Sequence, residues 1–420
     1  MASDSRARRV LLLLSPATYR AAAFLEAARK LGLEVVQGMD LPDALASQWN
    51  VPLGLDFGNP DAAVERIVEY ATRTPVDAVL SVDDSATILA ARASSALGLP
   101  HNSPDSAVAA RDKGVMRDLL SAGGAPVPHY DRFFLSEDPA VVSGRVAYPC
   151  VLKPLRLSGS RGVIRADSAA EFVAAWKRVR RLLVSEGNQP DTSHVLVEEF
   201  IPGFEVALEG ILTDGKLRVL ALFDKPDPLA GPFFEETIYV TPSRLPLEVQ
   251  DAVARCTAEA ARALGLWTGP VHAELRVNDR GPWIVEIAGR SIGGLCSMIL
   301  QFGTGMCLEE LILRHAVGME IEDYSREARA AGVMMIPIPG AGMLAAVHGV
   351  EEAKHVPGVE DVQITARLHQ PLVPLPEGAS YLGFIFARGD DPMTVEESLR
   401  EAHRCLSFEV RPHIQLLAAR

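Results

Sequence analysis

The 420-residue sequence predicts an α/β domain at the N-terminus, followed by two regions of α+β structure. Three observations support this fold class. Short apolar runs alternate with helical stretches at the start of the chain, short strands and hairpins begin near Gly123, and a Gly- and Pro-rich texture follows Tyr324. The length suggests roughly two to four domains. We expect three units, over residues 1–118, 119–328 and 329–420.

The N-terminal domain is predicted from its alternation of strands and helices. Its expected strands lie at residues 10–14, 33–38 and 76–83, and its expected helices at 19–31, 61–73 and 85–98. Such alternation is typical of a parallel sheet, in which ligands bind beyond the carboxyl ends of the strands. The loops at 15–18 and 81–85 are therefore candidate substrate contacts, although Asp84 and Ser85 would serve equally well to cap the next helix. No GxGxxG motif supports dinucleotide binding.

Composition excludes several classes of partner. The net charge of -13 argues against nucleic acid or an anionic membrane as the main partner. The five cysteines form no CxxC motif and the ten histidines show no zinc spacing, which suits free thiols in a reducing cytoplasm. No apolar run approaches the roughly 18 residues of a membrane span. The start, RARRVLLLLSPA, has too short an apolar run for a signal peptide and favours a buried first strand.

Two carboxylates stand in a predicted hairpin, VHAELRVNDRGPWIVEIAGR, over residues 271–290. Its two halves alternate apolar and polar residues, and a turn-forming Asn-Asp-Arg-Gly-Pro cluster separates them. A hairpin centred on that cluster places Val277 opposite Trp283 and Glu274 opposite Glu286. Like charges that face each other at roughly 5 Å repel, so a cation should lie between them.

The cation between Glu274 and Glu286 has two candidate identities. Mg²⁺ binds oxygen ligands, commonly one or two carboxylates together with substrate phosphates. The alternative is a solvated strand face on which Arg276 or Arg290 neutralises the pair. The hairpin alone does not decide between them.

The segment YPCVLKPLRLSGSRGVIRA, residues 148–166, has the pattern of a phosphate-binding hairpin. A strand that ends in Lys153 leads into a loop with four small residues, Ser158, Gly159, Ser160 and Gly162. Small residues let backbone N–H groups approach phosphate oxygens, and the lysine supplies a positive charge. A flexible hairpin tip is the alternative.

An acidic segment follows, HVLVEEFIPGFEVALEG at residues 194–210. Glu198 and Glu199 end a predicted strand, and Glu205 comes shortly afterwards. Backbone groups that leave such a strand can pair with an adenine edge, and a carboxylate several residues on can accept ribose hydroxyls. Exposed glutamates are common, so a solvated strand end is the alternative.

Two further motif matches have structural explanations. GILTDGK at residues 210–216 fits GxxxxGK, but Leu217 replaces the Ser or Thr that would hold Mg²⁺, and its Asp-Gly is better explained as a hairpin turn. GRSIG at residues 289–293 fits the GxSxG elbow of serine hydrolases. An elbow requires a buried parallel strand before it, whereas a carboxylate-bearing hairpin precedes this motif.

The order of these motifs resembles the ATP-grasp superfamily. A lysine-bearing strand, a Gly/Ser-rich hairpin, an acidic strand with Gly-x-Glu, and a two-carboxylate hairpin followed by arginine succeed one another between about residues 100 and 300. The resemblance implies two α+β lobes that close on ATP, with a lid subdomain at about residues 125–200. It also implies paired acidic residues that hold Mg²⁺, or alternatively Mn²⁺, between the phosphates.

The resemblance further implies a role for each candidate residue. It assigns Lys113 and Lys153 to the ATP phosphates, Ser158, Gly159, Ser160 and Gly162 to the lid, Glu198 with the backbone of Phe200 and Ile201 to adenine, Glu205 to ribose, Glu274 and Glu286 to the metal, and Arg290 with the backbone of Gly293 and Gly294 to the reacting phosphate. Lys153 and Arg290 are the implied catalytic residues. Substrate contacts are implied for His272, Arg290, Ser291, Gly293 and Gly294, with a structural role as the alternative for His272.

Three features resemble the L-amino acid (dipeptide) ligases of this superfamily. HAEL…VEIAGRSIGG resembles their His-x-Glu and Glu-x-x-x-Arg motifs, the chain continues well past the metal hairpin, and residues 369–403 look like the C-terminal domain of these ligases and of carnosine synthases. The resemblance implies an ATP-dependent carboxylate–amine ligase. In such a ligase a carboxylate takes the γ-phosphoryl group of ATP, and an amine then attacks the acyl phosphate to form an amide, with release of ADP and phosphate.

Two other functions are the alternatives. One is an ATP-grasp carboxylase or formyltransferase that acts on a small metabolite, of the biotin-carboxylase or purine-pathway type. The other is a non-catalytic nucleotide-binding regulator, which the presence of Lys153, Glu274, Glu286 and Arg290 disfavours. We expect small-molecule partners, namely amino acids or related carboxylates and amines, and neither nucleic acid nor membrane. By analogy with the family we also expect a homodimer.

Overall fold

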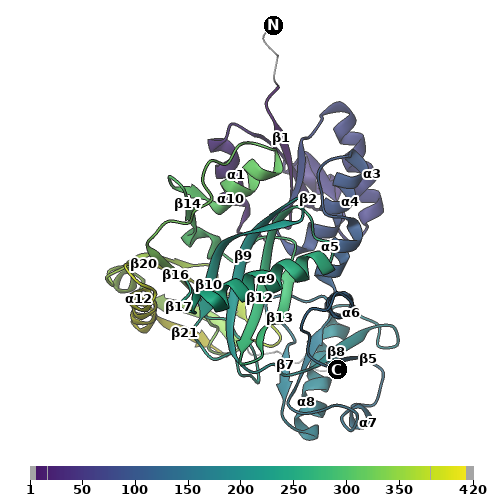
Figure 1. Cartoon of the computed structure of the whole chain (residues 1–420), viewed down its shortest axis with the longest axis vertical. Coiled ribbons are helices and arrows are strands. Elements are labelled where there is room, and N and C mark those ends of the chain that lie inside the picture. The colour runs from purple at the N-terminus through teal and green to yellow at the C-terminus, as the bar shows by residue number, and fades with distance from the viewer. Residues whose placement is uncertain (1–5, 17, 379, 413–420) are drawn as a thin grey trace.

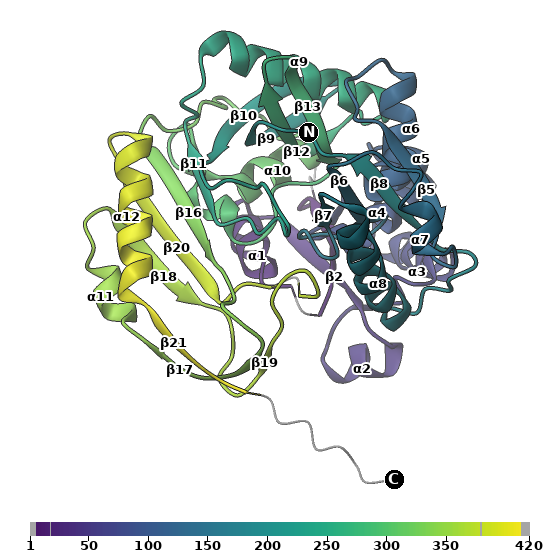
Figure 2. The same cartoon turned by 90° about the horizontal axis from the view of Figure 1, so that it is seen from below.

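The computed structural model describes residues 6–16, 18–378 and 380–412. Ala17, in a loop predicted to contact substrate, lies outside these described residues. The predicted fold class is confirmed, because a parallel sheet at the N-terminus is followed by antiparallel sheets and helices (Figures 1 and 2).

The N-terminal domain is a parallel sheet with the strand order β3-β2-β1-β4. Its elements are β1 (Arg9–Leu14), α1 (Ala21–Lys30), β2 (Glu34–Asp40), α2 (Asp43–Gln48), β3 (Leu53–Leu55), α3 (Pro60–Arg73), β4 (Ala78–Ser81), η1 (Asp84–Ala86) and α4 (Thr87–Leu97). The central strand β1 is buried over residues 10–14 because helices cover both faces of the sheet. Asn59 caps α3 by accepting a hydrogen bond from the Ala62 amide, and Pro60 follows in the first turn.

Helices α5 (Pro104–Arg111) and α6 (Lys113–Ala122) lead into a second sheet, which is antiparallel and has the order β5-β8-β6-β7. Its elements are β5 (Tyr130–Phe134), α7 (Pro139–Val142), β6 (Cys150–Pro154), β7 (Ile164–Ala166), α8 (Ala169–Ser185) and β8 (His194–Glu199). Phe172, Trp176 and Val179 pack α8 against this sheet. We call this unit the lid subdomain, and it lies at the lower right of Figure 1.

The largest sheet has eight strands in the order β13-β12-β9-β10-β11-β16-β20-β18. Its strands are β9 (Phe204–Thr213), β10 (Lys216–Lys225), β11 (Ile238–Thr241), β12 (Gly269–Asn278), β13 (Gly281–Ala288), β16 (Ala330–Ile336), β18 (Val359–Ile364) and β20 (Gly383–Gly389). Apolar side chains pack α9 (Leu247–Ala263) on one face and α10 (Leu308–Ala316) on the other. Because β11 pairs with β16, the third region of the chain continues the sheet of the second.

The last part of the chain adds a small sheet with the order β19-β17-β21. The remaining elements are η2 (Cys296–Ile299), β14 (Gln301–Phe302), β15 (Met306–Cys307), β17 (Gly342–His348), α11 (Val350–Lys354), β19 (Pro371–Leu372), α12 (Pro392–Cys405) and β21 (Ser407–Arg411). Val395, Leu399 and Ala402 pack α12 into the core formed by this region. Figure 2 shows α12 and α8 on opposite sides of the molecule, with the large sheet between them.

Candidate active site

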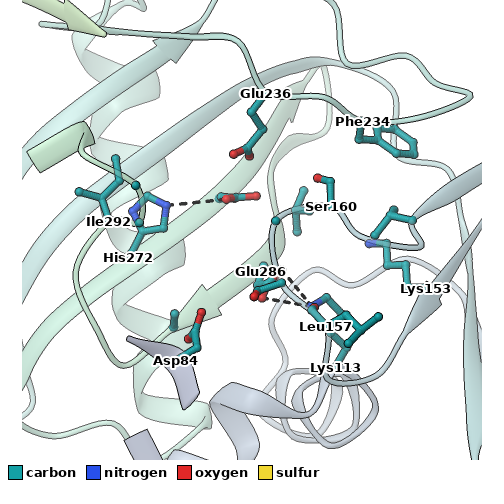
Figure 3. Close-up of a pocket in the computed structure, with 18 of the residues that line it drawn as sticks. Asp84, Lys113, Lys153, Leu157, Ser160, Phe234, Glu236, His272, Glu286 and Ile292 are labelled. Atoms are coloured by element: carbon teal, nitrogen blue, oxygen red, sulfur yellow. Dashed lines mark hydrogen bonds and ion pairs between the residues drawn. The ribbon is translucent and has the colours of Figure 1, made fainter. Parts of the chain in front are cut away.

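The three regions meet at a cavity of about 490 Å³. Loops after β1 and β4, the start of α6, the loop between β6 and β7, strand β8 and the large sheet all contribute to it. Predicted site residues that line it are Lys113, Lys153, Ser158, Gly159, Ser160, Glu198, Phe200, Ile201, Glu205, His272, Glu274, Glu286, Arg290, Gly293 and Gly294. Figure 3 shows several of these side chains directed into the same space.

Gly162 and Ser291 were predicted at the site but do not line this cavity. The amide of Gly162 donates to the Pro376 carbonyl at 2.7 Å, and a Cβ at this position would meet Pro154 Cγ at 2.6 Å. Ser291 is buried, and its hydroxyl accepts a hydrogen bond of 2.7 Å from Arg20. The structure therefore gives both residues a role in holding their loops. Ser291 also follows an antiparallel strand, so it does not occupy a nucleophile elbow.

The β12–β13 hairpin pairs Glu274 with Glu286, as predicted. The predicted pairing of Val277 with Trp283 is wrong, because the turn is shorter than expected and Val277 pairs with Pro282. The register must therefore shift by one residue between the turn and the two carboxylates.

A β-bulge at Val285 makes this shift. Leu275 pairs with Ile284, and the next pair along is that of Glu274 with Glu286, so Val285 has no partner of its own on β12. Ile284 is fully buried in the core, whereas Val285 and Glu286 both line the cavity. Without the extra residue, strand alternation would point Glu286 to the same side as Ile284, into the core.

A second bulge, between Val219 and Ala221 of β10, positions a residue that motif analysis missed. It brings Lys225 opposite Glu205. A regular hairpin around the same turn would have placed Asp224 there and left two carboxylates facing each other. The bulge instead aims the lysine at the carboxylates of the site.

Lys225 lies at the centre of three carboxylates. Its Nζ is 2.9 Å from Glu205, 2.5 Å from Glu236 and 3.5 Å from Glu274. Although burial opposes its charged form, these carboxylates raise the pKa of Lys225 well above the usual value. Burial and the nearby Glu274 raise the pKa of Glu236 to about 7, despite the contact with Lys225. The three carboxylates of Glu205, Glu236 and Glu274 therefore surround a cation that belongs to the protein itself, Lys225.

Glu286 has a separate cationic neighbour. Nζ of Lys113 lies 3.2 Å from the Glu286 carboxylate and donates to the Leu157 carbonyl at 2.9 Å (Figure 3). On the other strand, His272 Nε2 lies 3.7 Å from Glu274. Burial opposes ionisation of Glu274, but Lys225 and His272 hold its pKa well below the usual value. Glu274 is thus an ionised carboxylate, as a metal ligand must be.

Lys153 and Glu198 form a buried ion pair at the other end of the cavity. Their charged atoms are 2.5 Å apart, and Nε of Arg117 lies 2.6 Å from the same carboxylate. Burial opposes ionisation, yet Arg117 and Lys153 lower the pKa of Glu198 to about 2. The Glu198 side chain, predicted near adenine, is therefore ion-paired with both Arg117 and Lys153. Phe200 and Ile201 line the cavity next to it.

The loop that follows Lys153 has the backbone of an anion-binding turn. Gly159 and Ser160 both lie in the left-handed region, with φ of 64° and 56°, and both line the cavity. Successive N–H groups in such turns form concave sites that bind anions. Both residues line the same cavity as the buried Lys153, as a phosphate site requires.

Arg290 is anchored by Asp84 of the N-terminal domain. Its guanidinium lies 2.7 Å from the Asp84 carboxylate and also donates to the Ser291 carbonyl at 2.8 Å. Burial opposes ionisation of Asp84, but Arg290 and Arg111 lower its pKa to about 2. Ala86, not Asp84, is the N-cap residue of α4, so the capping alternative is not observed.

The N- and C-terminal regions build the end of the cavity opposite the lid. The hydroxyls of Ser15 and Thr18 donate to Asp83 at 3.1 and 3.2 Å, so both predicted contact loops reach the cavity. Tyr19 and Tyr381 also line it. Motif analysis missed both tyrosines because they come from distant segments without a local pattern. Lys225 had a usable signal, since it ends an apolar strand just as Lys153 does.

The donor atoms fit a divalent cation. One oxygen from each of Glu205, Glu236 and Glu274 lies within 4.8 Å of the others, and Glu286 faces Glu274 across the hairpin. Carboxylate oxygens are the ligands that Mg²⁺ and Mn²⁺ prefer. Lys225 already lies among the carboxylates of Glu205, Glu236 and Glu274. The side of Glu274 that faces Glu286 is therefore the one that fits a metal.

Comparison with known proteins agrees with this geometry. The ATP-grasp domain family matches residues 146–299, the ATP-grasp N-terminal domain family residues 25–101, and L-amino acid ligase C-terminal domain 2 residues 334–411. The crystal structure of an L-amino acid ligase from Bacillus licheniformis superposes with a TM-score of 0.81 at 27% identity. That similarity covers 97% of this chain and 100% of the other.

Two named relatives in sequence are also ligases or synthases. Alanine–anticapsin ligase of Bacillus subtilis (strain 168) is 28% identical over 61% of this chain and 58% of its own length. Dapdiamide A synthase of Enterobacter agglomerans is 26% identical over 67% of this chain and 68% of its own. The chain thus spans less than two thirds of the first of these relatives. With the site geometry and the matched domains together, the chain carries the ATP-grasp domains and the C-terminal domain of the L-amino acid ligases.

Proposed function

We propose that this chain is an ATP- and Mg²⁺-dependent ligase that joins the carboxylate of one amino acid to the amine of another. The observation that carries the proposal is the meeting of opposed carboxylates, Glu274 and Glu286, with three cationic side chains, Lys113, Lys153 and Arg290, in one cavity. The names of the relatives support amide-bond formation, and the C-terminal domain supports the amino acid ligase branch.

The residues present fit both ATP and a metal. Glu274 and Glu286 would hold Mg²⁺, which neutralises phosphate charge when it is bound. Lys113 and Lys153 would bind phosphate oxygens, together with the backbone of residues 158–160. The backbone of Phe200 and Ile201 would bind adenine, and Glu205 the ribose. These assignments follow from the chemistry of the donor atoms around the cavity.

The reaction has two bond-forming steps. A carboxylate oxygen of the first amino acid attacks the γ-phosphorus of ATP, and the bond to the bridging oxygen breaks with release of ADP. The amine nitrogen of the second amino acid then attacks the carbonyl carbon of the acyl phosphate, loses a proton and displaces phosphate. Arg290 and Lys113 would neutralise the charge that develops on the phosphoryl oxygens. The loop at 157–160 would exclude water that hydrolyses the intermediate.

The substrate end of the cavity is suited to a sizeable amino acid side chain. Tyr19, Tyr239 and Tyr381 line it, and Gly293 and Gly294 occupy little space beside them. We therefore propose amino acids or related small carboxylates and amines as the partners of this site.

Two broader expectations are also part of the proposal. None of the helices in the described residues has the length and apolarity needed to cross a membrane. We propose a cytoplasmic location, which five free cysteines support, and a homodimer by analogy with the family.

The test is phosphate release from ATP and Mg²⁺ against a panel of paired amino acids, with mass spectrometry of the products. We expect phosphate release together with a new mass equal to two substrates minus water. Glu248→Gln, at an exposed position in α9 that does not line the cavity, serves as the control variant that keeps this product. Binding of ATP without any amide product across the whole panel would contradict the proposal.

A further inference from the structure

Glu209 is a fully buried carboxyl group that the proposed chemistry does not use. It lies in β9 with none of its surface exposed, and it does not line the cavity. Its partner on the neighbouring strand β12 is His272. Among the described residues, His272 is also the ion-pair partner found for it, at 3.1 Å.

One oxygen of Glu209 joins two parts of the site. Oε2 accepts a hydrogen bond from Nδ1 of His272 and another, of 2.9 Å, from the backbone amide of Ile292. The opposite nitrogen of His272 lies 3.7 Å from Glu274, the proposed metal ligand. Ile292 lies in the loop between Arg290 and Gly294, which faces the substrate end. Glu209 therefore contacts both the metal side and the substrate side from behind the cavity wall.

The two hydrogen bonds of Oε2 account for only half of this carboxyl group. Its second oxygen, Oε1, is buried, and no hydrogen-bond partner for it is found within the described part of the chain. A buried polar atom without a partner costs free energy, so this carboxyl group satisfies two buried donors at a cost of its own. A residue with such a cost that is linked to two functional segments is typical of a functional role.

We propose that Glu209 is a positioning residue for the reaction. Through His272 it fixes the orientation of the Glu274 carboxylate toward the divalent cation, and through the Ile292 amide it fixes the loop that follows Arg290. This role rests on the proposed function, because it assumes that Glu274 binds the metal. Partners behind a metal ligand generally set its orientation, and their removal weakens metal binding about tenfold to a hundredfold.

The test measures Mn²⁺ affinity by electron paramagnetic resonance in the presence of a non-hydrolysable ATP analogue, together with thermal unfolding. Glu209→Leu should raise the Mn²⁺ dissociation constant about tenfold or more, and it should also lower the melting temperature, because the Ile292 amide and His272 Nδ1 lose their acceptor. Glu209→Gln keeps an acceptor for the Ile292 amide but not the charge, so it should show a smaller increase. His272→Ala should weaken Mn²⁺ binding as well, and adding Glu209→Leu to it should cause little further loss, because both act on Glu274 through one path.

Glu309 provides the matched control. It is also a buried glutamate, but its carboxylate accepts from Ser297 at 2.6 Å, away from the cavity. Glu309→Gln should leave Mn²⁺ affinity unchanged. If the wild-type protein binds Mn²⁺ and forms product while Glu209→Leu binds Mn²⁺ equally well, the positioning role is overturned. If the wild-type protein itself binds no Mn²⁺ with the analogue, the proposed function fails instead.

Discussion

Glu274 has carboxylate neighbours on two sides, and the two sides differ in how their negative charge is balanced. We call them the closed group and the open group. On one side Glu205 and Glu236 surround Lys225, whose side chain is only 3% exposed. On the other side Glu286 faces Glu274, and its side chain is 30% exposed, with Lys113 at 3.2 Å. One group is closed around an internal cation, whereas the other is open toward the cavity.

The difference shows how one carboxylate can serve two purposes. Lys225 and His272 lower the pKa of Glu274 in a half-buried position, where desolvation alone would raise it. The open side then offers the carboxylate oxygens of Glu274 and Glu286, with room for a cation and for phosphate. In the proposed function, the closed group sets the charge of Glu274, and the open group would bind the metal. Two predictions test this division directly, and two test the ion pairs at the edges of the cavity.

The largest expected effect is a difference in the rate of ATP turnover between the Glu286→Gln and Glu236→Gln variants. Glu286→Gln should lower the rate of ATP turnover about a hundredfold to a thousandfold, because the proposed metal loses a negatively charged ligand on the open side. Glu236→Gln keeps an oxygen for Lys225 and should lower the rate less than about tenfold. Steady-state kinetics with both variants, checked for folding by circular dichroism, measures the contrast. Equal losses in the two variants would remove the distinction between the groups.

Removal of the internal cation should destabilise the protein. Lys225→Met leaves the half-buried Glu236 without its cation. It also leaves Glu205 with Arg276 alone and Glu274 with His272 alone, and breaking such a group costs about 3–5 kcal/mol of unfolding free energy. The vacated centre should then bind Mn²⁺, so added Mn²⁺ should raise the melting temperature of the variant more than that of the wild type. A variant as stable as the wild type without metal would contradict the role given to Lys225.

Acid unfolding tests the buried ion pair at the ATP end. The pKa of Glu198 is lowered from 4.5 to about 2, so its contribution to stability is present above pH 4.5 and is lost as the pH falls toward 2. The contribution is on the order of 3 kcal/mol. Denaturant unfolding between pH 6 and pH 2 should show this loss in the wild type and in Glu199→Gln, which changes an exposed neighbour. If the unfolding free energy of Glu198→Gln falls with pH as steeply as that of the wild type, another group causes the acid sensitivity.

The smallest effect concerns the lid over the open side. Glu377 pairs with Arg178 of α8 at 2.8 Å, and its carbonyl accepts from Arg161 at 2.7 Å, so the C-terminal region contacts the lid subdomain. Glu377→Gln should raise the KM for ATP a few-fold, as expected for a partly exposed ion pair. Glu186→Gln breaks a pair that lies within the lid subdomain and should not change the KM. An unchanged KM in both variants would mean that this contact does not affect closure.

The sequence predicted the fold class and the residues that stand in local motifs. Glu274 and Glu286, Lys153 and the small residues of the loop were found because strand alternation and composition reveal them. Lys225 ends an apolar strand as Lys153 does, but its position opposite Glu205 could not be predicted, because a bulge in β10 decides which residue faces Glu205 and a bulge has no reliable sequence signal. The same limit explains why the pairing of Val277 was predicted wrongly although that of Glu274 was right.

The substrate end was harder to predict for a different reason. Tyr19 and Tyr381 pack against the same residue, Phe384, with ring centroids 6.0 and 6.3 Å away. They come from opposite ends of the chain, and only the packing of the N-terminal domain on the large sheet brings them together. Arg290 was found as a motif, but its anchor Asp84 required knowledge of that packing.

The most direct test of the division around Glu274 is a crystal structure with Mn²⁺ and a non-hydrolysable ATP analogue, with the metal located by its anomalous signal. We predict a single position or a pair of positions within about 2.1 Å of oxygens from both Glu274 and Glu286, with Lys225 still among Glu205 and Glu236. A metal that displaces Lys225 and binds Glu205, Glu236 and Glu274, with no contact to Glu286, would contradict the account.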